Sequence, residues 1–195
     1  EITASSGLQI SDDVARSLGE GRKAGMTPLA PAFMDFERWR RGPPEKFSET
    51  RDQLRASIAS SKLVSRKNNQ MSLAQFYLAH GLEAEALGVL GIMASEDANV
   101  INDTYFKGLS GVANYYLGRY DKAEKDLTVG ALKNDSHAKL WLGAIKAQQN
   151  IWKEALINFD SGFAVLGKYS TEIRDEMRIL AGTAALSMGE IERAE

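Results

Sequence analysis

Cysteine is absent from this chain of 195 residues. Its absence excludes disulfides, thiolate nucleophiles and zinc sites with cysteine ligands. Histidine is scarce as well, because His80 and His137 are the only two in the sequence, and they do not form a metal-binding pair on one helix face. We therefore expect no metal and no cofactor, and we predict solvated or helix-capping roles for both histidines.

Long apolar runs and blocks of like charge are also lacking. The longest apolar stretch, residues 86–94, is far shorter than the roughly 20 residues that a membrane-spanning helix needs. The formal net charge is -2, and a small basic surplus in residues 1–70 is offset by an acidic surplus in the remainder. The composition predicts a soluble globular chain with neither a membrane span nor a nucleic-acid partner.

Small residues recur in the sequence at fixed offsets, and this repeat predicts the fold. Four turn positions each lie seven residues after another small residue, and an alanine follows each turn five residues later. The turn positions are Gly81, Gly118, Asn150 and Gly189. The preceding residues are Ala74, Gly111, Gly143 and Gly182, and the alanines are Ala86, Ala123, Ala155 and Ala194.

Each repeat unit is predicted to be two antiparallel helices joined by a tight turn. Apolar residues follow the helical period before each turn, and no segment alternates with the period of a strand. Extra residues occur between units and not within them, as expected for stacked helical hairpins. The small residues allow the two helices of a hairpin to cross closely. The sequence thus predicts an all-α stack of antiparallel helix pairs.

This pattern resembles the tetratricopeptide repeat, on the strength of Gly111, Gly118, Tyr120 and Ala123 in one unit and Gly143, Trp152 and Ala155 in the next. The resemblance covers about residues 67–195; the proline that usually closes the second helix is missing from every unit. It implies a right-handed superhelix, or α-solenoid, that binds a protein or peptide in a concave groove. The implied groove residues are Met71, Gln75, Tyr105, Val112, Tyr115, Leu140, Ala144, Ile179 and Thr183.

The predicted organisation has three parts. Residues 1–44 form an irregular linker with short helices, and residues 45–66 form a capping or partial-repeat helix. About 3.5 repeats follow, at residues 67–98, 104–135, 136–167 and 175–195. Because the chain begins at Glu1 and ends within a helical pattern, we expect a fragment of a longer protein that self-associates through its last unit.

The segment around residues 34–90 is similar to long repeat proteins of alphaproteobacteria. It carries the stretches DFERW and LAQFYLAHGLEAEALGVL on which this likeness rests. The likeness implies a bacterial cell envelope or periplasm, while a cytoplasmic location stays open.

Several short motifs invite a chemical interpretation, and each has a simpler one. GEGRKA at residues 19–24 is predicted to be a flexible linker, because no strand precedes it. ERWRR at residues 37–41 is predicted to be an anchoring Trp39 with arginines that reach solvent. Acidic and basic residues at 172–178 are predicted to pair on a solvated helix face. NDT at Asn102 and NDS at Asn134 match glycosylation triplets in loops.

We predict a non-enzymatic scaffold that holds an unidentified protein or peptide in an apolar groove. A carboxylate clamp is not expected, because the corresponding places carry apolar or uncharged residues such as Met71 and Gln75. The alternative is a spacer or oligomerisation arm for an activity elsewhere in a longer protein. A groove filled by Phe33, Phe36 and Trp39 of the chain itself favours this alternative.

Overall fold

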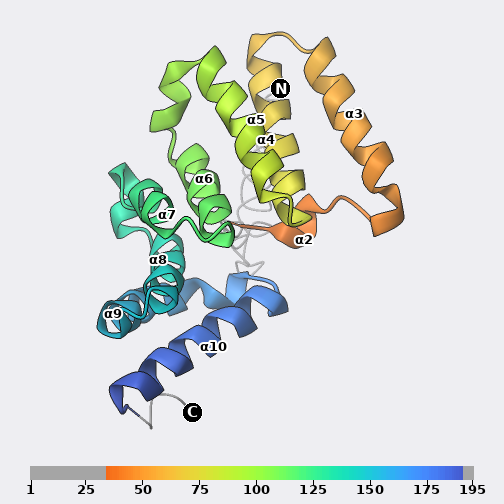
Figure 1. The fold of residues 1–195 in the computed structure, drawn as a ribbon. Helices are drawn as coiled ribbons and strands as arrows, with labels where there is room; N and C mark the ends of the chain where they lie inside the picture. Colours follow the sequence, from red (N-terminus) through yellow and green to blue (C-terminus); the bar gives the residue numbers. More distant parts are fainter. Residues whose placement is uncertain (1–33, 191–195) are drawn as a thin grey trace, which may run out of the picture. The chain divides into compact units, whose positions relative to one another are not determined.

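The structure is a computed structural model that describes residues 34–190 (Figure 1). All regular elements in that range are helices, and no strand occurs there, so the all-α prediction is confirmed. The predictions for residues 1–33 and 191–195 fall outside this range. The α-helices are α2 (Phe36–Trp39), α3 (Phe47–Ser60), α4 (Leu63–Ala79), α5 (Glu83–Glu96), α6 (Thr104–Tyr116), α7 (Tyr120–Leu127), α8 (Ser136–Gln148), α9 (Trp152–Gly162) and α10 (Thr171–Met188).

The helices form consecutive hairpins. The most extensive contacts join α4 to α5, α6 to α7 and α8 to α9, and each hairpin also packs on the next through α5 with α6 and α7 with α8. In Figure 1, α10 passes beside α8 and α9, as the contacts also record. Residues 45–66 comprise a short 3-10 helix, η1 (Pro44–Lys46), then α3 and the start of α4.

Three hairpin turns lie at predicted turn positions, Gly81, Gly118 and Asn150, and the fourth predicted position, Gly189, is the C-cap of α10. Gly81, Gly118, Asn150 and Gly189 all have positive φ, between 61° and 78°. This left-handed conformation favours glycine and is tolerated by asparagine, because most side chains clash with the backbone there. The sequence therefore identified the turns through their backbone requirement.

The helix crossings explain the recurring small residues. A Cβ atom added to Gly111 would lie 2.6 Å from Cγ of Leu127, and one added to Gly143 would lie 2.7 Å from Cδ1 of Phe159. The alanines Ala86, Ala123 and Ala155 on the opposite helices are 0% exposed. The small residues thus let each pair of helices approach closely enough for a large side chain of the second helix to cover the first.

Three 3-10 helices connect the hairpins to the elements that follow them. Each connector contributes one buried apolar side chain to the core, which keeps the connection folded against the hairpins. The connectors are η2 (Ala98–Asn102) with Val100, η3 (Gly130–Asn134) with Leu132, and η4 (Phe163–Lys168) with Leu166.

Candidate partner-binding site

The nine predicted groove residues divide between the core and the surface. Val112, Leu140 and Ala144 are 0% exposed and Tyr115 is 4% exposed. Met71, Gln75 and Tyr105 are half-buried, whereas Thr183 is exposed and Ile179 is 68% exposed. Only the two ends of the predicted groove, on α4 with α6 and on α10, therefore offer side chains to a partner in this structure.

Gln75 and Tyr105 are brought together from neighbouring hairpins. The Nε2 atom of Gln75 donates a hydrogen bond to the hydroxyl oxygen of Tyr105, at 2.6 Å. Burial raises the pKa of Tyr105 above its usual value, which further favours the neutral hydroxyl. The pair forms a neutral polar patch between α4 and α6.

The segment that contains α2 is buried against neighbouring helices. Met34, Phe36 and Trp39, in and beside α2, are 1%, 8% and 8% exposed. The ring of Phe36 lies against the ring of Tyr116 in α6, and α2 packs beside α4 (Figure 1). We call the surface that holds α2 the α2 slot: the end of α4, Tyr116 and the start of α10.

Polar contacts fix the end of α2 in the slot. The Nε atom of Arg40 donates to the carbonyl oxygen of Ala79 at 3.2 Å, and its guanidinium forms an ion pair with Glu172 of α10 at 3.2 Å. The Nε2 atom of His80 lies 3.2 Å from the carbonyl oxygen of Arg40, and since a carbonyl only accepts, this nitrogen donates. The segment thus joins α4 to α10.

Glu176 closes the same side from α10. Its two carboxylate oxygens accept hydrogen bonds from the hydroxyls of Tyr115, at 2.8 Å, and Tyr116, at 3.1 Å. Burial, reinforced by the charge of Glu176, raises the pKa of both tyrosines far above the ordinary value. The prediction that residues 172–178 pair on a solvated face is wrong for Glu172 and Glu176, which bind partners on α2 and α6, and holds for Asp175 with Arg178.

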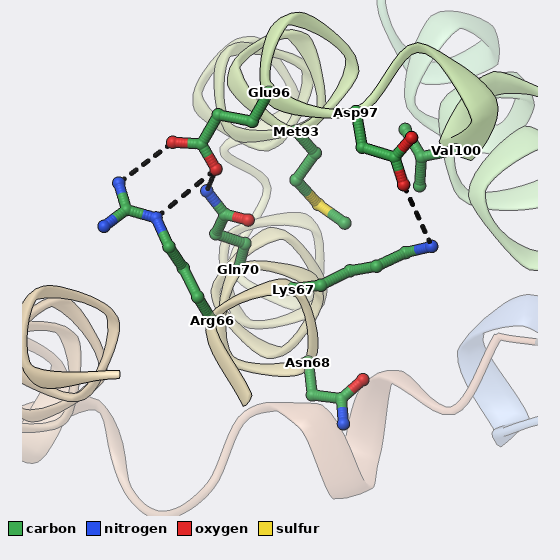
Figure 2. Close-up of a pocket in the computed structure, with 8 residues that line it drawn as sticks. All are labelled: Arg66, Lys67, Asn68, Gln70, Met93, Glu96, Asp97 and Val100. Carbon is green, nitrogen blue, oxygen red and sulfur yellow. Dashed lines mark hydrogen bonds and ion pairs between the residues drawn. The ribbon is translucent and has the colours of Figure 1, made fainter. Parts of the chain in front are cut away.

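A pocket of about 480 Å³ opens between the start of α4 and the end of α5 (Figure 2). Its floor is apolar, because Met93 and Val100 are 2% and 1% exposed. On one side Arg66 pairs with Glu96 at 2.9 Å, and on the other Lys67 faces Asp97 at 4.0 Å. We call it the α4–α5 pocket. Its apolar floor suits an uncharged side chain of a ligand, and the ion pairs on either side suit polar groups next to that side chain.

One stripe of α4 links this pocket to the predicted groove. Lys67, Met71 and Gln75 are spaced four residues apart, so they lie on one helix face. All three side chains keep part of their surface accessible. The α4–α5 pocket and the Gln75–Tyr105 pair are therefore the two ends of a single accessible stripe.

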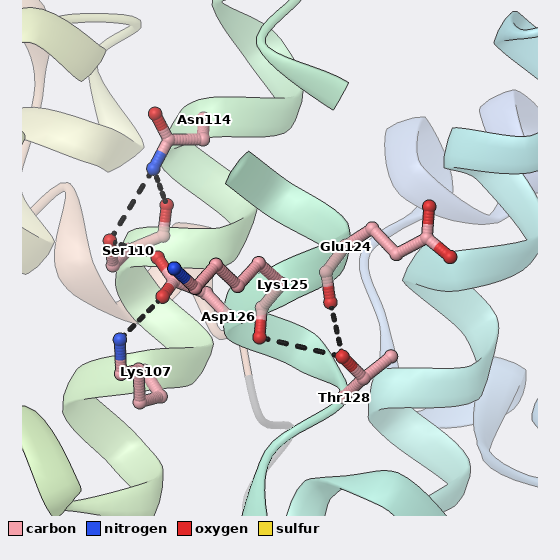
Figure 3. Close-up of polar contacts among 7 residues, drawn as sticks. All are labelled: Lys107, Ser110, Asn114, Glu124, Lys125, Asp126 and Thr128. Atoms are coloured by element: carbon pink, nitrogen blue, oxygen red, sulfur yellow. Dashed lines mark hydrogen bonds and ion pairs between the residues drawn. The ribbon is translucent and has the colours of Figure 1, made fainter. Parts of the chain in front are cut away.

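A second polar cluster fastens α6 to α7 (Figure 3). Asp126 accepts from Nζ of Lys107 and from the hydroxyl of Ser110, both at 2.6 Å, while the buried side chain of Asn114 donates to the carbonyl oxygen of Ser110. The side chains of Lys107 and Asp126 are 24% and 13% exposed. The charges of Lys107 and Asp126 pair across the hairpin, so this contact holds the two helices together.

Both histidines are partly exposed and lie beside aromatic rings; His80 is the C-cap residue of α4, in line with the predicted capping role, whereas His137 contacts Tyr169. His80 lies 4.5 Å from Phe76 between ring centroids, and Nδ1 of His137 lies 2.8 Å from the hydroxyl of Tyr169. Burial lowers the pKa of His137, which favours the neutral ring. Among the described residues, no group of His, Asp and Glu side chains is placed to hold a metal ion.

The remaining motifs receive structural roles. Trp39 is buried as an anchor, as predicted, while GEGRKA lies outside the described residues. In the NDT and NDS triplets, Asp103 and Asp135 cap α6 and α8 by accepting from backbone N–H groups. An aspartate before a predicted helix is a known capping signal, and it could have identified both caps from the sequence.

Comparison with protein-family models, curated proteins and solved structures found no match for this chain. Within residues 34–190, none of the helices combines the length and apolar character needed to cross a membrane.

Proposed function

We propose that this chain is a non-enzymatic helical-repeat scaffold of the tetratricopeptide type that binds a protein or peptide partner. The observation that carries the proposal is the register shared by the hairpins, with Gly111 against Leu127 and Gly143 against Phe159 after equivalent spacings. Units of this kind pack mainly on their sequence neighbours and leave extended surfaces for partners.

The surface that best suits a partner is the accessible stripe on α4 with the α4–α5 pocket. A peptide along Lys67, Met71 and Gln75 would place an apolar side chain on the floor formed by Met93 and Val100. Binding surfaces commonly combine an apolar anchor position with a polar rim, and here the two ion pairs form that rim.

Site-specific crosslinking tests this assignment. A photoreactive amino acid is placed at Asn68, an exposed residue at the pocket, and for comparison at Ala59, an exposed residue on α3. We expect one reproducible adduct at Asn68 in cells of the source organism, lost when Lys67→Glu is added and kept when Lys62→Glu is added. Equal labelling at both positions would count against a partner at this surface.

The second candidate is a spacer or oligomerisation arm. It is favoured by the α2 slot, where the chain buries its own Phe36 and Trp39, and by exposed apolar residues on α10. Ile179 and Leu186 are 68% and 61% exposed and lie seven residues apart, on one face of the helix. That face suits a second copy of the chain.

Sedimentation velocity separates this candidate from a monomeric scaffold. We expect an arm to self-associate as concentration rises, and Leu186→Glu to abolish the association. Ile157→Glu is the matched control, because Ile157 is 56% exposed but lies on α9. A chain that remains monomeric at every concentration excludes self-association through α10.

A further inference from the structure

We infer that the α2 slot is a recognition site for a short helical segment with two aromatic residues three positions apart followed by arginine, and that α2 is a resident copy that a partner segment displaces. This inference rests on the proposed function, a scaffold that binds a protein or peptide. It adds the chemistry of the ligand and a way in which the chain regulates access.

The first argument is the way in which α2 is held. This helix has only four residues, yet Phe36 and Trp39 are both buried, and the aromatic rings lie 5.8 Å apart between centroids. A helix this short has little stability of its own, so the slot supplies most of what keeps it folded. A peptide ligand in a groove is held in the same way, by a few anchor side chains.

The second argument is that the slot binds polar groups of α2 as well as its aromatic rings. The carbonyl oxygen of Ala79 is one of the last in α4, where helical partners run out, and it accepts from Arg40. Glu172 supplies a negative charge to the same guanidinium, and His80 donates to the backbone of Arg40. An arginine directly after the second aromatic therefore donates a hydrogen bond to the free carbonyl of Ala79 and neutralises the charge of Glu172.

The third argument is that α2 leaves space in the slot. A cavity of about 130 Å³ remains beside it, lined by Met34, Asp35, Phe36, Glu37 and residues 168–170. The hydroxyl of Ser170 is buried there, and no hydrogen-bond partner for it occurs among the described residues. A ligand that also places a polar group against Ser170 would fit the slot better than α2 does.

The fourth argument is the connection between α2 and the rest of the chain. Arg41 and Gly42 have φ values of 56° and 132°, and Pro43 follows before η1. Positive φ at Arg41 is unfavourable for a residue with a side chain, so contacts in the slot hold this linker in place. The linker acts as a tether from which α2 can leave while α3 stays packed on α4.

The experiment measures binding of a fluorescein-labelled peptide with the sequence of residues 34–42, MDFERWRRG, by anisotropy. The tethered α2 is present at a high effective concentration and competes with the peptide. We expect the full-length Phe36→Ala/Trp39→Ala variant to bind the peptide roughly tenfold or more tighter than the parent chain. A peptide with both aromatics replaced by alanine should not bind.

Two further variants keep the test decisive if the double variant loses its helical circular dichroism. Arg40→Ala removes the side-chain contacts to Ala79 and Glu172, leaves the aromatics of α2 in place, and should also tighten peptide binding. Adding Glu172→Arg to it should weaken the binding again, because the peptide's own arginine then meets a positive charge.

Equal, weak binding to the parent and to folded variants overturns the inference and makes α2 an ordinary part of the core. A dimer of the parent chain that the peptide dissociates also overturns it, because the second occupant is then another copy. An adduct at Asn68 together with no peptide binding leaves the proposed scaffold standing and removes only this inference.

Discussion

The ring of Phe36 lies against the ring of Tyr116, with 6.1 Å between the centroids, although the two residues are 80 positions apart. Tyr116 also contacts Trp141 at 5.7 Å, and Trp141 contacts Tyr169 at 6.2 Å. Because Trp141 is 0% exposed, these rings connect α2 to the centre of the core. A continuous series of ring contacts therefore runs from α2 through α6 and α8 to Tyr169.

We expect a side chain at Gly162 to destabilise the fold and an alanine at Gly91 to stabilise it. A Cβ at Gly162 would lie 2.6 Å from the backbone N and Cα of Leu140, which cannot move without shifting α8. We expect Gly162→Ala to lower the free energy of unfolding by roughly 1 to 3 kcal/mol.

Gly91→Ala is the control for that change. Nothing lies within 4 Å of the added Cβ, and alanine favours a helix interior over glycine, so we expect a gain of about 0.5 to 1 kcal/mol. Both values come from urea unfolding followed by circular dichroism. A Gly162→Ala variant as stable as the parent would show that α8 and α9 are farther apart than described.

These contacts also show why the hairpins could be predicted from sequence. Turn residues and close crossings depend on positions within one hairpin, and they impose glycine, asparagine or alanine locally. The partner of Glu176 could not be predicted in this way. Glu176 accepts hydrogen bonds from tyrosines 60 and 61 residues away in the sequence. Helical spacing alone predicts ion pairs between Glu176 and its near neighbours.

The dependence on contacts between distant segments also explains why several predicted groove residues are buried. The resemblance placed Tyr115, Val112, Leu140 and Ala144 on one accessible side of the hairpins, but it could not indicate that all four are buried in the folded chain. Burial by distant segments depends on the whole packing arrangement. Phe36, for example, lies beside Tyr116, which is distant in the sequence and comes close only in the folded chain.

Acid should destabilise the fold through His137. Burial lowers its folded-state pKa below the unfolded value of about 6.5, nearby Lys168 acts in the same direction, and Asp135 partly opposes the shift. Below about pH 6.5 the unfolded chain therefore binds more protons at His137 than the folded chain does. The free energy of unfolding falls as the pH drops through that value. Urea unfolding between pH 5 and 7.5 should show this slope.

His137→Gln removes the titrating ring and should flatten that part of the profile, although it also alters the contact with Tyr169. If the variant and the parent keep the same slope between pH 5 and 7.5, another group is responsible. The slope is the quantity to compare, because the substitution changes the absolute stability at every pH.

Alkaline pH should also destabilise the fold, through the ionisation of buried Tyr169 on unfolding. Burial raises the pKa of Tyr169 above the unfolded value of about 10, so its hydroxyl ionises on unfolding but not in the fold. Stability is therefore lost as pH rises above about 10. We expect Tyr169→Phe to make that loss shallower, by up to about 1.4 kcal/mol per pH unit. Phenolate absorbance and helical signal should change together in the parent chain.

Glu176 should contribute more to stability than its neighbour Asp175, although both are acidic residues on α10. Glu176 accepts two tyrosine hydroxyls at 2.8 and 3.1 Å, whereas Asp175 forms an ion pair with the exposed Arg178 at 3.5 Å. Hydrogen bonds to a charged acceptor are worth more than exposed ion pairs. We expect Glu176→Gln to cost about 1 to 3 kcal/mol and Asp175→Asn to change stability by less than about 0.5 kcal/mol. Urea unfolding at pH 7 gives both values, and near-ultraviolet circular dichroism reports the tyrosine environment. Similar losses for the two variants, with an unchanged tyrosine signal, would mean that Glu176 does not hold α10 against α6.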